Sequence, residues 1–109
     1  MVVTVEVVAT EKDRPPAGAP VIVRVRDTAL QDAPAIVLGE AQGIVSGNQG
    51  VSLVTVEVPV NGTGEEPTVW AHVDVDRDGR VSQHDFVTKQ SYPLPPGPEP
   101  RLEVLVSRV

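Results

Sequence analysis

The chain has 109 residues, a formal net charge of −6 and no cysteine. This length fits one domain with a single core, and the lack of cysteine excludes disulfides, zinc–thiolate sites and a thiol nucleophile. The 9 lysine and arginine residues form no basic run, so nucleic acid and anionic membranes are not expected partners. Hydrophobic residues make up 40% of the chain but aromatic residues only 3%, which predicts a core of valine and other aliphatic side chains.

Alternation of apolar and polar residues predicts seven β-strands and no helix. In chain order, the expected strands cover residues 3–7, 21–26, 36–45, 54–60, 68–73, 86–92 and 101–108. Gly39 and Gly43 interrupt the third strand, which predicts a bulge or a close backbone approach, and Pro59 predicts a strand end or a sheet edge. The chain is therefore expected to form one domain over residues 1–109, an all-β antiparallel sandwich of immunoglobulin- or transthyretin-like architecture.

The connections between the strands are rich in glycine, proline and polar residues. Residues 27–34 are expected to form a compact loop, and Ser46–Gly50 a turn. The run from Pro93 to Pro100 has too many prolines for a strand and is expected to run extended over the surface.

The segment Asp74–Asp85 matches the pattern of a calcium loop. It reads DVDRDGRVSQHD, with acidic residues at positions 1, 3, 5 and 12, glycine at 6, an aliphatic residue at 8 and a hydroxyl at 9, as in the EF-hand. Ca²⁺ takes about six to eight oxygen ligands, which a short chain supplies by curling around the ion. The predicted ligands are the side chains of Asp74, Asp76, Asp78, Ser82 and Asp85 and the main-chain carbonyl of Arg80. Ca²⁺ is the expected ion, with Mg²⁺ or Na⁺ as alternatives.

Other positions in this segment refine the hypothesis. Gly79 would permit the sharp turn, and Val81 would anchor the loop to the core. The twelfth position is Asp85, one methylene shorter than the glutamate of an EF-hand, and the flanking residues predict strands in place of helices. The alternative interpretation is a long hairpin turn whose aspartates are only solvated.

The stretch Pro15–Leu38 resembles a known family. It reads PPAGAPVIVRVRDTALQDAPAIVL, and the DTALQDAP within it resembles the signature of the YbaY/YscW family, as does the later hairpin followed by Tyr92 and Pro93. The resemblance implies a small β-sandwich, often a lipoprotein, and in the YscW branch a pilotin that chaperones an outer-membrane secretin in type III secretion. The chain has no lipobox cysteine, and its segment 74–85 is longer than the family's hairpin, so the metal hypothesis rests on this sequence alone.

No stretch approaches the length of a membrane span, and Met1 leads into the first strand without a signal peptide. We therefore expect no membrane insertion and a cytoplasmic location for the chain as written. A secreted or periplasmic location is the alternative if a leader has been removed.

A small hydrolase is a remote alternative. His72 shares a strand face with Asp74, as a base and its orienting group would, but the available nucleophiles, Ser82, Ser91 or a threonine, stand in no recognisable motif. We expect no catalytic residues, with His72 facing outward beside Trp70.

The sequence thus predicts a non-enzymatic β-sandwich in which a structural Ca²⁺ loop ties two late strands together. The alternative is a pilotin- or chaperone-like module that holds a segment of an unknown protein partner. It would do so by strand addition at an exposed edge, or through the loops Ser46–Gly50 and Pro93–Pro100.

Overall fold

The structure is a computed structural model that describes residues 1–10, 12–28, 36–47, 50–62 and 65–109. These residues form seven strands and no helix. The strands are β1 (Val2–Val8), β2 (Pro20–Asp27), β3 (Ile36–Ile44), β4 (Ser52–Pro59), β5 (Pro67–Val73), β6 (Phe86–Thr88) and β7 (Arg101–Arg108). Six of them follow the predicted ranges closely, whereas β6 is shorter than expected. None of the described segments is a helix that could cross a membrane.

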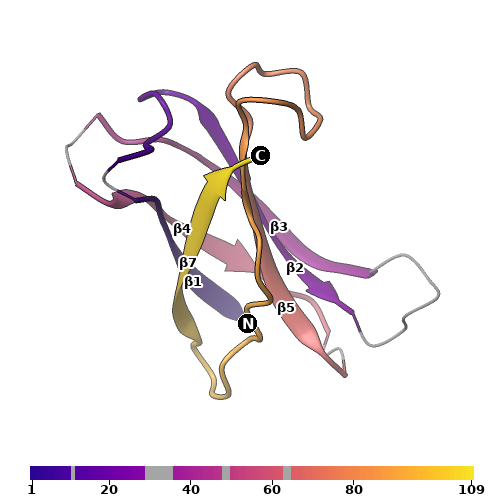
Figure 1. Cartoon of the computed structure of the whole chain (residues 1–109). Helices are drawn as coiled ribbons and strands as arrows, with labels where there is room; N and C mark the ends of the chain where they lie inside the picture. The colour runs from indigo at the N-terminus through magenta and orange to yellow at the C-terminus, as the bar shows by residue number, and fades with distance from the viewer. Residues whose placement is uncertain (11, 29–35, 48–49, 63–64) are drawn as a thin grey trace.

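The strands form one sheet that folds over on itself into two layers. Their order is β3-β2-β5-β6-β7-β1-β4. In Figure 1, β1, β4 and β7 lie on one side and β2, β3 and β5 on the other. The predicted all-β sandwich is confirmed. The paired strands are antiparallel except β1 and β7, which run parallel, with Val5 opposite Leu102.

The core between the layers consists almost entirely of aliphatic side chains, as the composition predicts. Alternate residues of each strand point inward, because side chains of a strand alternate between its two faces. Phe86 and Leu53 are the largest fully buried side chains. Around them lie the buried valines Val3, Val5, Val7, Val21, Val23, Val25, Val58, Val73, Val104 and Val106.

The two end strands, β3 and β4, approach each other and nearly close the sheet. The amide of Asn61 donates to the carbonyl of Leu38 at 3.0 Å, and the amide of Ser46 donates to the carbonyl of Leu53 at 2.8 Å. Between these bonds, Gly39 lies directly against the main chain of Pro59. This close approach, and a register shift between Val25 and Arg26 opposite β3, agree with the predicted interruption of that strand.

Replacing Gly39 by alanine is expected to lower the free energy of unfolding by about 1–3 kcal/mol, because the fold has no room for a side chain there. An added Cβ would lie 2.2 Å from the carbonyl oxygen of Pro59, so backbone must move. Urea unfolding would measure the change. Gly47→Ala is the control, since a Cβ at Gly47 would meet nothing within 4 Å. Equal midpoints for the two variants would contradict the prediction.

Two of the predicted connections lie partly outside the described residues. The compact loop expected at 27–34 contains the undescribed residues 29–35, and the turn Ser46–Gly50 contains the undescribed residues 48–49. The run Pro93–Pro100 is described and begins alongside β5, where the amide of Leu94 donates to the carbonyl of Pro67 at 2.9 Å.

Candidate functional site

Two features at opposite ends of the sheet are candidates for function. The acidic segment 74–85 connects β5 to β6 and lies at the same end as the C-terminus (Figure 1). The proline-rich connection 93–100 leads into β7 at the other end, near the N-terminus (Figure 1). We describe the acidic segment first.

Four of the predicted ligands come together in the acidic segment. Asp74, Asp76, Asp78 and Asp85 can each offer one carboxylate oxygen so that all four oxygens lie within 4.8 Å of one another. Asp74 and Asp85 are buried, while Asp76 and Asp78 are exposed. The segment therefore gathers four carboxylates at the protein surface, two of them buried and two exposed to solvent.

The backbone of the segment curls around this group. Gly79 has a φ of 76°, a value that glycine adopts readily, and its amide donates to Asp74 Oδ2 at 2.9 Å. The amide of Arg80 donates to Asp78 Oδ1, also at 2.9 Å. The predicted role of Gly79 in the turn is confirmed by its positive φ.

Asp76 is held by a short hydrogen bond within the loop. Ser82 Oγ donates to Asp76 Oδ2 at 2.5 Å. This bond is the largest cause that lowers the pKa of Asp76 to about 2. Ser82 thus lies beside the acidic group, as its predicted ligand position requires. The role of the Arg80 carbonyl stays a prediction.

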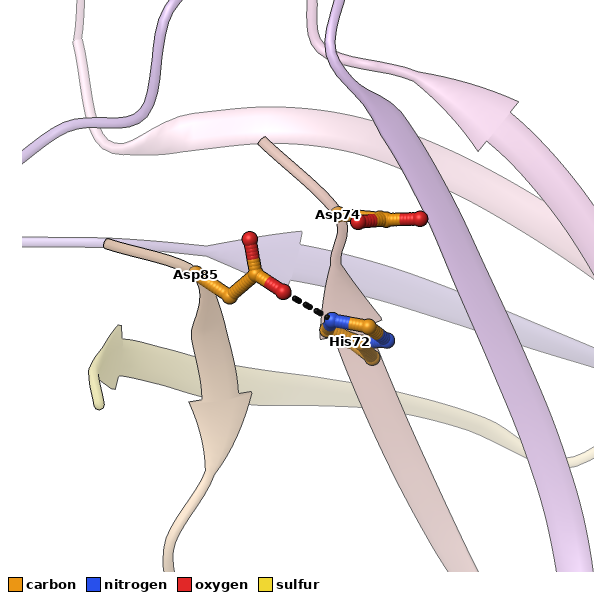
Figure 2. A group of neighbouring side chains, drawn as sticks. All are labelled: His72, Asp74 and Asp85. Carbon is orange, nitrogen blue, oxygen red and sulfur yellow. Dashed lines mark hydrogen bonds and ion pairs between the residues drawn. The ribbon is translucent and has the colours of Figure 1, made fainter. Parts of the chain in front are cut away.

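Asp85 closes the segment from inside the protein and is fully buried. Its Oδ1 accepts a hydrogen bond from the Val75 amide at 2.8 Å, and its Oδ2 accepts one from the Ser82 amide at 3.2 Å. His72 Nε2 lies 2.8 Å from Oδ2, and Figure 2 shows the carboxylate directed at the imidazole ring. Burial raises the pKa of Asp85, but the bonds from His72, Ser82 and Val75 outweigh it and lower the pKa below its usual value. Asp85 therefore links the last residue of the segment to His72 of β5 and to the amides of Val75 and Ser82.

The contact between His72 and Asp85 is the part of the site that sequence reasoning missed. His72 lies on the outward face beside Trp70, as expected, with 5.7 Å between the ring centroids. It is nevertheless only 3% exposed, because the segment folds over it. The sequence alone does not fix the strand register that creates this contact. In the structure, His72 pairs with Val87, which places Asp85, two residues before Val87, on the same face.

The prediction for Val81 is wrong. It was expected to anchor the segment in the core, yet it is 49% exposed. Val75 packs against the core instead. The physical reason is that the segment is held by the hydrogen bonds of Asp85, so its middle needs no apolar contact.

The candidate nucleophiles and base of the hydrolase alternative do not contact one another in the described hydrogen bonds. The described partners of the Ser82 hydroxyl are carboxylates, Asp76 and Asp85, and the ring of His72 is directed at Asp85. Ser91 is exposed beyond the end of β6.

An apolar pocket of about 240 Å³ lies at the opposite end of the molecule. Its walls include Leu38 of β3, Val60 just after β4, and Leu94, Pro95 and Pro100 of the proline-rich connection. The pocket is therefore built where the two end strands of the sheet meet that connection.

Comparison with known proteins supports the fold. No protein-family model and no curated protein matches the chain, so the resemblance to the YbaY/YscW family is not confirmed. Among solved structures, the chain is similar to an alternative pilotin from the type II secretion system of Vibrio cholerae. The TM-score is 0.77 at 23% identity, and the match covers 100% of this chain and 96% of that protein. The chain thus shares its fold with that protein over its whole length.

Proposed function

We propose that the chain is a non-enzymatic protein-binding module of the pilotin kind, which holds an apolar segment of a partner protein in the pocket beside the proline-rich connection. The observation that carries this proposal is the open apolar pocket lined by Leu38, Val60 and Leu94. The full-length likeness to a pilotin supports it.

The walls of the pocket suit a protein ligand. Pro95, Pro96 and Pro100 have restricted backbones, so little conformational entropy is lost when a ligand is bound against them. Leu94 is held by the hydrogen bond that its amide donates to the carbonyl of Pro67, and its side chain packs partly against the core. An apolar side chain of a partner would be removed from water there, which is the main favourable term in protein association.

The structure favours this loop over strand addition between β3 and β4. The two strands are held together by the bond from Asn61 to Leu38, and Gly39 lies against Pro59, so an added strand would have to separate them. The pocket needs no such opening. Of the two binding modes in the alternative prediction, the loop Pro93–Pro100 is therefore the one we propose.

The partner class to test is an outer-membrane secretin, because it is the partner that the YscW resemblance implies. Secretin domains encoded in the same genome would be titrated into the chain by calorimetry. Leu94→Ser is expected to weaken binding by about tenfold or more, since an apolar contact at the centre of an interface often exceeds 1 kcal/mol.

Leu105→Ser is the matched control. Leu105 is an exposed leucine of β7, 39% exposed, that does not line the pocket, so this variant should keep its affinity. Thermal melts of both variants show that each is folded. Failure of every secretin domain to bind would overturn the proposed partner, and equal weakening by both variants would overturn the proposed pocket.

A further inference from the structure

We propose that the segment Asp74–Asp85 binds Ca²⁺ through oxygen ligands alone, and that His72 is a positioning residue that holds Asp85 in place for the ion. This site lies at the opposite end of the sheet from the pocket and does not depend on the proposed function.

The spacing of the oxygens fits the size of the ion. Ca²⁺ binds oxygens at roughly 2.3–2.6 Å, so ligands on opposite sides of it are about 4.6–5.2 Å apart. The oxygens of Asp74, Asp76, Asp78 and Asp85 all lie within 4.8 Å of one another. Mg²⁺ demands a near-ideal octahedron and usually keeps several waters, so a site built largely from protein carboxylates suits Ca²⁺ better.

One carboxylate of the group has a buried oxygen without a hydrogen-bond partner. Asp74 is only 4% exposed, and its Oδ1 is buried without a hydrogen-bond partner among the described residues. Its other oxygen accepts a bond from the Gly79 amide. A buried carboxylate oxygen without a partner is costly, and native structures rarely leave one. A cation among the four carboxylates would satisfy it.

The segment carries four aspartates against two arginines, Arg77 and Arg80. No lysine or arginine in the described part of the chain forms an ion pair with Asp74, Asp76 or Asp78. Arg77, inside the segment, instead donates to the carbonyl of Gly18 at 3.2 Å. Several carboxylates this close repel one another, and a divalent cation is the partner that removes the repulsion.

A Zn²⁺ site with His72 as a ligand is the competing interpretation. His72, Asp74 and Asp85 also form a group whose ligand atoms lie within 4.8 Å of one another, and imidazole is a ligand for Zn²⁺. However, the Nε2 of His72 is already 2.8 Å from Asp85 Oδ2 (Figure 2). In that position it orients a carboxylate, as the hydrogen-bond partners of metal ligands commonly do.

The first experiment compares the binding of three ions and the effect of replacing the two exposed aspartates. Chelator-treated chain would be melted and titrated by calorimetry with Ca²⁺, Mg²⁺ and Zn²⁺. At a hundredfold excess over the dissociation constant, Ca²⁺ is expected to raise the melting temperature by roughly 10–15 °C. Asp76→Asn and Asp78→Asn change exposed side chains and leave the core intact, and each should weaken Ca²⁺ binding by about tenfold or more. Asp13→Asn, at an aspartate outside the segment that is paired with Arg108, is the control that should bind Ca²⁺ normally.

The second experiment tests the role of His72. The affinity for Ca²⁺ is expected to fall by about 10–100-fold in His72→Leu. It should be largely rescued in His72→Gln, whose amide can donate to Asp85. A merely structural role would lower the melting temperature of the chelator-treated protein without changing the affinity for Ca²⁺.

Three outcomes would overturn the proposal. No shift with any ion would leave a solvated acidic hairpin. A shift with Zn²⁺ but not Ca²⁺, lost in His72→Gln, would make His72 a ligand of a different kind of site. Unchanged Ca²⁺ affinity in Asp76→Asn and Asp78→Asn would place the ion elsewhere.

Discussion

Replacing Phe86 by alanine is expected to lower the free energy of unfolding by about 3–5 kcal/mol. Phe86 is 1% exposed and is the largest fully buried side chain among the described residues. It belongs to β6, which has only 3 residues and pairs with β5 on one side and β7 on the other. Phe86 is paired with Val73 of β5 and Arg108 of β7, and its ring belongs to the core where these strands join the two layers.

Urea unfolding followed by circular dichroism would measure this loss. A domain of this size has a total stability of about 5–15 kcal/mol, so the variant is expected to be marginally folded. Val87→Ala, at the half-buried next residue of the same strand, is the control and should lose much less. Similar midpoints for the two variants would show that Phe86 does not occupy the joint between the layers.

Replacing Asp85 by alanine in the presence of chelator is expected to cost about 3–5 kcal/mol of stability. The change leaves the buried ring of His72 and the amides of Val75 and Ser82 without their acceptor. A buried donor that loses its partner carries its full desolvation cost. Because chelator removes free divalent ions, this experiment measures the hydrogen bonds of Asp85 apart from any role as a ligand.

Asp78→Ala under the same conditions is the control, because it removes the same charge from an exposed position of the segment. Asp78 is an exposed residue of the same segment, and its removal should change stability by less than about 0.5 kcal/mol. Thermal and urea unfolding of the two variants should therefore differ clearly. An equal, small effect for both would mean that Asp85 does not hold the segment to β5.

The two candidate sites are connected by a single strand. β5 begins with Pro67, which lines the apolar pocket, and ends with Val73, next to the acidic segment. Along its whole length, β5 is paired with β2. A cation at one end would therefore stabilise the hairpin of β5 and β6 without occupying the surface that we propose for the partner.

The strands and the clustering of the aspartates could be predicted from the sequence because both depend on local spacing. Alternating valines place every second side chain in the core whatever the neighbouring strand is, so the seven strands could be predicted from periodicity. The aspartates at positions 1, 3 and 5 of the segment are near one another along the chain, and Gly79 permits the turn that gathers them. Gly39 likewise signalled a close approach, although not its partner, Pro59.

Only the tertiary structure decided which distant residues meet. The parallel pairing of β1 with β7, the pocket formed by Leu38, Val60 and Leu94, and the burial of His72 under Asp85 join segments that are far apart in the sequence or separated by a loop. The error at Val81 has the same origin, because an aliphatic residue at the eighth position says nothing about whether the fold brings a core surface to it. Strand periodicity is set by the backbone of each residue, whereas burial depends on what the rest of the chain places on top of it.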